Sequence, residues 1–352
     1  MTPQLMDPTA SNKTERLNEM AFAHMNSAAL LAAIELGIFT AIAAGARTAE
    51  EIGSRVGIHP EAADRLLIVC KALQLVREEG GRYRNLSDVD RYLVKTSPTY
   101  FGDYLVYQAG AGYSGGGFSG GKGLVEHLTG ANAEKRAKVQ KMYASLISSR
   151  ESARAFTTAG YNASIALAHR LAKQFDFSRF TQRLDLAGGS GCYSIAACER
   201  YPKLRSIIMD HPYVIEVTRE FVAKHGLQDR IGVMPGDFFT TEYPRGCDLI
   251  SFITPLQGYM PDEVRKALRV AFDALVPGGT LLVVDYMLND TKTGPLDPAL
   301  MNLAGVRHGE FIGRVNSGPE FREFFGDAGF ANLDVWWLME HQLGVVTGQK
   351  PA

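Results

Sequence analysis

The spacing of hydrophobic residues changes along the chain and divides it into a helical front part and an alternating back part. From Leu17 to Ala44, alanine, leucine and methionine recur at helical spacing with a break at Gly37, which predicts two helices. From Arg183 onward, short apolar runs alternate with helical segments. This alternation is typical of an α/β fold, in which helices cover both faces of a mostly parallel sheet. Residues 333–351 hold two apolar runs with little between them and predict a closing antiparallel pair.

The front part ends in a pattern typical of a winged helix. Thr48 precedes Glu51 at capping-box spacing, and Pro60 opens the next helix. The pair Gly80–Gly81 then separates two short extended pieces. Helix, turn, helix and hairpin together predict a winged-helix unit.

Winged helices often bind DNA, so two uses of this unit are open. The second helix carries Arg65 and Lys71 beside Glu61 and Asp64, with apolar residues among them. Such mixed charge is typical of a packing helix and not of a basic reading head. We therefore expect a dimer-packing unit and no nucleic-acid partner, and a DNA-binding regulator with a ligand-sensing domain stays the alternative.

A mostly helical connector follows, and a glycine-rich segment interrupts it at residues 110–123. Glycine gives that segment wide freedom of backbone conformation. Its aromatic residues Tyr113 and Phe118 are candidates for covering a ligand, and a plain surface loop is the equal alternative.

Composition removes several classes of function. The 352 residues are 46% hydrophobic and 21% charged, as in ordinary globular proteins, and a net charge of -1 gives no attraction to nucleic acid or to an anionic membrane. No apolar run reaches the roughly 18 residues of a membrane span, and the first residues do not resemble a signal peptide, so we expect a cytoplasmic protein. The 4 cysteines form no paired motif, which predicts buried free thiols and no metal site.

The segment LDLAGGSGCYS is an apolar run that ends in glycines. Gly188, Gly189 and Gly191 follow the first strand of the back part and precede a helix. Such a turn lets a ligand approach the backbone and places its anionic group at the positive end of the helix. Asp210, at the end of the next strand, fits the acid that holds ribose hydroxyls, and this much suits a nicotinamide dinucleotide as well.

Two further features favour a single adenosyl group with a positive charge. Asp237 and Phe238 follow the third strand and supply an acid for an adenine amino group and a ring for its face. Asp185 ends the first strand just before the glycines and is expected close to a positively charged ligand.

The runs LDLAGGSG, MDHP, GDFF and LVPGGTLLVVDYMLND, behind a winged-helix front part, resemble the S-adenosylmethionine-dependent small-molecule O-methyltransferases of plants and bacterial secondary metabolism. The resemblance runs from about residue 17 to the end. It implies a Rossmann-like class I methyltransferase domain and a homodimer. It also implies that the three glycines line the methionine part of S-adenosylmethionine, that Asp210 holds its ribose, and that Asp237 and Phe238 frame its adenine. The expected domains are a winged-helix-like dimerisation domain at 1–105, a helical connector contributing to the substrate pocket at 106–165 and the cofactor-binding domain at 166–352.

The chain departs from this family where the acceptor's proton is normally removed. Family members usually have a histidine after the fourth strand, and this chain has Gln257, followed by Gly258 and Tyr259. The supporting glutamate of the family is matched by Val315. Because an amide takes no proton at neutral pH, whereas a histidine with a pKa near 6.5 does, the usual base is missing.

The missing base leaves the reaction open. Acidic phenols, amines and nucleophilic carbons manage without it, with Gln257 orienting the acceptor and Tyr259 stacking on it or bonding it. His308 is a candidate replacement base or acceptor anchor, and an ordinary packing histidine is the alternative. A third possibility is an enzyme that keeps S-adenosylmethionine but catalyses a cyclisation or decarboxylation. The family's layout implies a flat, apolar, aromatic or polyketide-like acceptor, with lining candidates Tyr107, Met142, Tyr143, Phe252, Met301 and Phe311.

Overall fold

The computed structural model describes residues 13–110, 134, 137–141, 143–144, 146–340 and 342–352. The chain forms two compact units, Met1–Val106 and Tyr107–Ala352. Each unit has a hydrophobic core of its own. Most of the predicted connector, residues 106–165, belongs by this division to the second unit. The glycine-rich stretch 111–123, with Tyr113 and Phe118, and the lining candidate Met142 lie outside the described residues.

The first unit is the predicted winged helix. Gly37, with φ of 78°, separates the first two helices, and a capping box of Thr48 and Glu51 begins the third. Pro60 is the first residue of the fourth helix. The hairpin turns through Gly80 and Gly81, both with positive φ. The elements of this unit are α1 (Lys13–Leu36), α2 (Ile38–Ala43), α3 (Ala49–Val56), α4 (Pro60–Ala72), β1 (Val76–Glu79), β2 (Arg82–Asn85) and α5 (Ser87–Tyr92), and α6 (Gly102–Gly110) follows.

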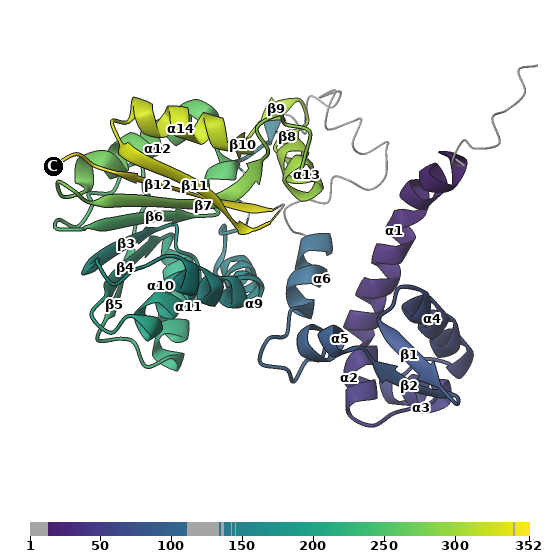
Figure 1. The fold of residues 1–352 in the computed structure, drawn as a ribbon. Coiled ribbons are helices and arrows are strands. Elements are labelled where there is room, and N and C mark those ends of the chain that lie inside the picture. The colour runs from purple at the N-terminus through teal and green to yellow at the C-terminus, as the bar shows by residue number, and fades with distance from the viewer. Residues whose placement is uncertain (1–12, 111–133, 135–136, 142, 145, 341) are drawn as a thin grey trace, which may run out of the picture. The chain divides into compact units, whose positions relative to one another are not determined.

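The second unit is built on a sheet whose path runs β11-β12-β7-β6-β3-β4-β5 (Figure 1). The five strands from β7 to β5 are parallel, as the alternating sequence predicts. They are β3 (Gln182–Leu186), β4 (Arg205–Asp210), β5 (Ile231–Pro235), β6 (Leu249–Ile253) and β7 (Thr280–Leu288).

Helices cover both faces of this sheet, and each layer has its own core (Figure 1). Apolar side chains of α9 (Arg150–Gln174), α10 (Cys192–Arg200) and α11 (Pro212–Lys224) pack on one face. Those of α12 (Pro261–Ala274) and α14 (Gly318–Asp327) pack on the other. This layering leaves the carboxyl ends of the parallel strands as the edge where loops from both faces meet.

The predicted antiparallel pair closes one side of the sheet. Strand β12 (Leu343–Gln349) pairs antiparallel with β7, and β11 (Ala331–Met339) pairs antiparallel with β12. The pairing of β11 shifts register twice, between Ala331 and Asp334 and between Trp337 and Met339. The remaining elements are η1 (Leu256–Gly258), α13 (Leu296–Ala304), β8 (Val306–Arg307), β9 (Glu310–Phe311) and β10 (Asn316–Ser317).

All 4 cysteines are buried and free, as predicted. Within the described part of the chain, no helix is both long enough and apolar enough to pass through a membrane.

Candidate cofactor and acceptor site

The turn after β3 leaves no space for side chains at two of its three predicted glycines. A Cβ on Gly188 would lie 2.8 Å from Ile208 Cγ2, and one on Gly191 would lie 2.7 Å from Ile208 Cδ1. At Gly189, where φ is 55°, a Cβ would meet nothing within 4 Å. Gly191 has φ of 78° and is the N-cap of α10. The turn is therefore packed against the core at two positions and open at the third, beside the N–H groups that begin a helix.

Asp210 holds this turn from the end of β4. Its Oδ2 accepts a hydrogen bond from Gly189 N at 2.8 Å, and its Oδ1 accepts one from His211 N at 2.6 Å. Burial raises the pKa of Asp210 to about 6, although both N–H donors act to lower it. Each carboxylate oxygen has a further lone pair, so the group can still accept hydrogen bonds from the hydroxyls of a ligand.

Asp185 lies in a buried polar network and not at an open ligand site. Its Oδ1 accepts hydrogen bonds from Arg183 Nη2 and Ser251 Oγ, both at 2.8 Å, and its Oδ2 accepts one from Ser194 Oγ at 2.7 Å. Arg183 is 0% exposed and Asp185 1%. The positive partner of Asp185 within the protein is thus Arg183, and its predicted closeness to a charged ligand stays a prediction. A Cβ on Gly188 would lie 3.1 Å from Asp185 Cγ, so this ion pair supports the glycine turn from the core side.

The loop after β5 brings Asp237 and Phe238 next to Asp210. Gly236 N donates to Asp210 O at 2.9 Å, which fixes the start of the loop. Asp237 is exposed, and its Oδ1 accepts from Phe239 N at 2.7 Å. Phe238 is 7% exposed and packs edge-on against Phe252 at 5.3 Å between ring centroids. The acid therefore lies at the surface of the loop, and the ring lies largely inside it.

Gln257 lies in η1, the short turn after β6, and is 2% exposed. Its Nε2 donates to Tyr143 Oη at 3.0 Å, and Tyr143 Oη donates to Thr254 O at 3.0 Å. Gln257 Oε1 is buried, and nothing in the described residues hydrogen-bonds to it. Gln257, where the resemblance leads us to expect the base, is thus an amide with one unsatisfied acceptor atom.

A carboxylate that the sequence did not reveal supports this turn. Asp285 on β7 is 2% exposed, and its Oδ2 accepts from Leu256 N at 2.9 Å and from Gln257 N at 3.1 Å. Its Oδ1 accepts from Tyr286 N at 2.7 Å. Burial raises the pKa of Asp285 to about 8, and the three N–H donors limit the rise. The signal in the sequence is the charged residue that ends the apolar run LLVV.

Close packing also fixes the backbone beside Gln257. A Cβ on Gly258 would overlap the ring of Tyr143. On the other side, a Cβ on Gly313 would lie 2.9 Å from Gly258 Cα, and Arg314 N donates to Tyr259 O at 3.1 Å. Residues 256–259, called the acceptor turn because the acceptor substrate is expected there, are therefore held between Tyr143 and the segment around Gly313.

Tyr259 connects the acceptor turn to the loop after β5. Its ring packs edge-on against Phe238 and Phe239, with centroids 5.4 Å apart in both cases. Lys141 Nζ lies 5.9 Å from the Tyr259 centroid and forms an ion pair of 2.6 Å with Glu263. Burial raises the pKa of the Tyr259 phenol, so it stays neutral at physiological pH. The predicted cofactor residue Phe238 and the predicted acceptor residue Tyr259 are thus in direct contact.

His308 lies at the tip of the β8–β9 hairpin, where its φ is 49° and that of Gly309 is 80°. Ile312 N donates to Gly305 O at 2.9 Å and closes the base of the hairpin. Gly313, the next residue, packs on Gly258 of the acceptor turn. His308 therefore belongs to a segment that contacts the acceptor turn through its base.

Val315 and the predicted residues of the acceptor pocket differ in how deeply they are buried. Val315 is 1% exposed and adds no polar side chain to the site. Phe252 is 0% exposed and Phe311 is 66% exposed, so one is core and the other is surface. The ring of Tyr107 lies 6.4 Å from that of Phe156, which in turn lies 6.2 Å from Tyr143.

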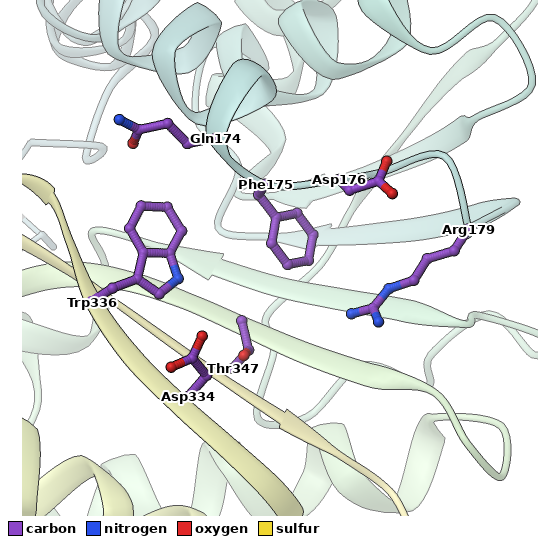
Figure 2. A pocket seen from close by; sticks show the side chains of 7 residues that line it. All are labelled: Gln174, Phe175, Asp176, Arg179, Asp334, Trp336 and Thr347. Atoms are coloured by element: carbon purple, nitrogen blue, oxygen red, sulfur yellow. The ribbon is translucent and has the colours of Figure 1, made fainter.

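A cavity of about 280 Å³ opens elsewhere on the second unit and contains none of the predicted site residues. Figure 2 shows Trp336, Asp334 and Thr347 on one side of it and Phe175 and Arg179 on the other. The guanidinium of Arg179 already stacks over a phenylalanine ring, Phe180, at 4.8 Å. This cavity is not the site described above.

The predicted cofactor residues meet at one edge of the sheet. The glycine turn, Asp210 and the loop after β5 follow the carboxyl ends of three adjacent strands, and η1 follows the fourth. Strand β3 lies between β4 and β6, so the order in which successive strands are added to the sheet reverses at β3. Open α/β sheets bind ligands at such a point. The bare turn and the available lone pairs of Asp210 fit an adenosyl ligand.

Comparison with protein families covers most of the chain. The O-methyltransferase domain matches residues 125–331, and the O-methyltransferase dimerisation domain matches residues 18–95. The chain is 32% identical over 335 residues to 3-hydroxy-5-methyl-1-naphthoate 3-O-methyltransferase of Streptomyces sahachiroi, covering 95% of this chain and 94% of that protein.

The chain is also similar to an enzyme named for methyl transfer to carbon and to a solved structure with the same fold. L-tyrosine C(3)-methyltransferase of Streptomyces lavendulae is 28% identical over 318 residues, covering 88% of this chain and 83% of that protein. The crystal structure of human N-acetylserotonin methyltransferase in complex with S-adenosylmethionine shares the fold with a TM-score of 0.84, at 22% identity, covering 99% of this chain and 100% of that one. The chain therefore belongs to the S-adenosylmethionine-dependent small-molecule O-methyltransferases, a family of enzymes with a class I methyltransferase fold and an N-terminal dimerisation domain.

Proposed function

We propose that this enzyme methylates a small, flat, apolar acceptor of secondary metabolism, aromatic or polyketide-like, without a histidine base at the usual position. The observation that carries the proposal is the buried amide of Gln257, whose Oε1 is left without a hydrogen-bond donor by the described residues. An amide orients a substrate by hydrogen bonding and does not remove its proton. The acceptors that suit such a site are acidic phenols, amines and nucleophilic carbons.

In this proposal the cofactor occupies the edge of the sheet. S-Adenosylmethionine supplies a methyl group already activated by its sulfonium. The glycine turn holds the methionine part, and Asp210 accepts hydrogen bonds from the ribose hydroxyls. Asp237 accepts from the adenine amino group, with Phe238 at the base's face. The support for these roles is the open position at Gly189 and the lone pairs left on Asp210.

The acceptor's side of the site works by positioning. Gln257 orients the acceptor, and the neutral phenol of Tyr259 stacks on it or bonds it. Holding an acceptor in line with an activated methyl group can supply effective molarities on the order of 10⁵ M, which is a large part of the rate enhancement. The two relatives from Streptomyces are named for methyl transfer to oxygen and to carbon. Their difference supports a proposal that leaves the acceptor atom open.

His308 is proposed as an acceptor anchor or replacement base, because Gly313, at the base of its hairpin, packs on the acceptor turn. His308→Gln should lower kcat more than tenfold if the imidazole takes the proton, and should raise KM alone if it anchors the acceptor. Unchanged turnover and KM would remove the residue from the mechanism.

The experiment that tests the proposed function has two parts. Calorimetry should show tight binding of S-adenosylhomocysteine and none of a nicotinamide dinucleotide. Incubation with S-adenosylmethionine and hydroxynaphthoates, naphthols and naphthylamines should release S-adenosylhomocysteine with at least one of them. Failure of both parts would overturn the assignment.

A second candidate function is a cyclisation or decarboxylation that uses S-adenosylmethionine without consuming it. This alternative is favoured because Gln257 stands in place of the family's histidine base and Val315 stands in place of the supporting glutamate. Product formed without release of S-adenosylhomocysteine would select this alternative.

We also infer that the enzyme is a homodimer with no nucleic-acid or membrane partner. The match of residues 18–95 to a dimerisation domain supports this assembly.

A further inference from the structure

The hydroxyl group of Tyr143 sets the orientation of the Gln257 amide. Tyr143 has one hydroxyl proton, and it donates that proton to Thr254 O at 3.0 Å. Toward Gln257 the phenol oxygen can therefore only accept a hydrogen bond. The amide meets this condition by turning its NH₂ group to Tyr143 at 3.0 Å, which leaves Oε1 pointing elsewhere.

Two features of the site disfavour the opposite orientation of the Gln257 amide. A flipped amide would place Oε1 against a phenol oxygen with no proton to give, so two acceptors would face each other. The side chain has little freedom to move away, because Gln257 N is bonded to Asp285 and Gly258 packs under the ring of Tyr143. The backbone carbonyl oxygen of Thr254 can only accept a hydrogen bond. It therefore fixes the direction of both bonds, from Tyr143 to Thr254 and from Gln257 to Tyr143.

This order leaves one buried acceptor that needs a donor. Gln257 is 2% exposed, and no donor for Oε1 exists among the residues that the structure describes. An unsatisfied acceptor in a protein interior is destabilising, because it loses its hydrogen bonds to water and gains none in return. A ligand that supplies an O–H or N–H here recovers that cost, whereas an ether, a carbonyl or an anion adds repulsion.

We propose that Tyr143 is a specificity-determining residue: by fixing Gln257 Oε1 as an acceptor, it selects substrates that present a neutral hydroxyl or amine N–H at this point. The proposal rests on the proposed function, because it assumes that the acceptor binds beside η1. It narrows the substrate class to flat apolar molecules that place a neutral hydrogen-bond donor at this point, and the reacting oxygen of an ionised phenol is then a different group. Tyr143 acts through Gln257 and need not touch the reacting atom.

The test compares two ligands that differ only in the donor. The enzyme is saturated with S-adenosylhomocysteine, and the affinities of 2-naphthol and 2-methoxynaphthalene are measured by calorimetry. The wild type should prefer the naphthol by about tenfold, the size expected for one hydrogen bond of about 1.4 kcal/mol. Gln257→Met should abolish the preference.

Tyr143→Phe is the decisive variant, because it keeps Gln257 but frees its amide to flip. Its preference for the naphthol should fall to less than threefold, since either end of the amide can then face the ligand. Tyr201→Phe is the matched control: Tyr201 Oη also donates to a backbone carbonyl, Ala172 O at 3.1 Å, and its loss should leave the preference unchanged.

A second measurement requires no acceptor. Urea unfolding of Tyr143→Phe, Gln257→Met and the double variant should give a non-additive change in the free energy of unfolding, which reports their hydrogen bond. Additive changes, or equal or undetectable affinity of the wild type for the two naphthalenes, would overturn the inference. Retained binding of S-adenosylhomocysteine in that case would leave the proposed function standing, and its loss would instead refute the proposed function.

Discussion

Gly191 is the position where backbone conformation and packing both exclude a side chain. Its φ is 78°, and a Cβ there would lie 2.7 Å from Ile208 Cδ1. Gly191→Ala should therefore lower the free energy of unfolding by more than the roughly 1–2 kcal/mol that left-handed backbone costs an L-residue. Urea denaturation measures this change.

Gly189→Ala is the matched control, since its φ is also positive, at 55°, but its Cβ would meet nothing within 4 Å. It should lower the free energy of unfolding by about 1–2 kcal/mol, the cost of the left-handed backbone conformation alone. Equal destabilisation by the two variants would contradict the packing argument.

The role proposed for Asp210 predicts that cofactor binding depends on pH. The pKa of Asp210 is raised to about 6, and in the proposed site its ionised form accepts hydrogen bonds from the ribose hydroxyls. Affinity for S-adenosylhomocysteine should therefore fall as the pH falls through 6, by about tenfold at pH 5, because the proton competes with the ligand. Calorimetry at pH 5 and pH 7.5 measures the change. Asp210→Asn should bind weakly at both values, and a wild-type affinity that is flat across this range would argue against the role of the carboxylate.

At the residue scale, sequence alone predicted what depends on local geometry. Gly188 and Gly191 were visible because a bare turn must follow the strand, and Asp210 because it ends the next one. The buried network of Arg183 was not visible, because it includes Ser251, 68 positions further along the chain. The orienting role of Tyr143 was not visible either, because it contacts Gln257 across 114 positions. No periodicity or spacing rule encodes such contacts.

At the scale of elements, the turn η1 depends on Asp285 of β7. The folded pKa of Asp285 is about 8 and its ordinary value is 3.8, so between these values the folded protein holds a proton that the unfolded chain releases. The free energy of unfolding should therefore lose a contribution as the pH rises from about 4 to about 8.

Asp285→Asn removes this titration. The stability of the wild type relative to the variant should decrease between pH 5 and pH 8, as measured by urea unfolding at both values. The variant should also lose stability overall at pH 5, because its NH₂ group faces backbone donors. Wild-type and variant profiles that run parallel with pH would show that Asp285 does not titrate in this range.

Strands and helices with long, regular patterns were predicted correctly, and the short ones were not. The five parallel strands and the closing pair follow from apolar runs, and α3 follows from its capping box. The two-residue strands β8, β9 and β10 are too short to show a period of their own. Strands β8 and β9 pair with each other in a local hairpin, and β10 pairs with the distant strand β7. The acceptor turn was predicted only as a position in the family's pattern.

At the scale of the whole molecule, the dimerisation domain predicts a concentration-dependent assembly. Light scattering should give about twice the mass of one chain, and the unfolding midpoint should fall on dilution, since dissociation precedes or accompanies unfolding. A monomer mass and a midpoint independent of concentration would contradict the homodimer.

The irregular pairing of β11 has a consequence for how the enzyme behaves at high concentration. A regular outermost strand would offer its unpaired amides as a template for another molecule's strand. The two register shifts in β11, and the acidic Asp334 beside one of them, interrupt that template. This margin of the sheet is thereby poorly suited to adding a foreign strand, which favours colloidal stability over fibrous aggregation.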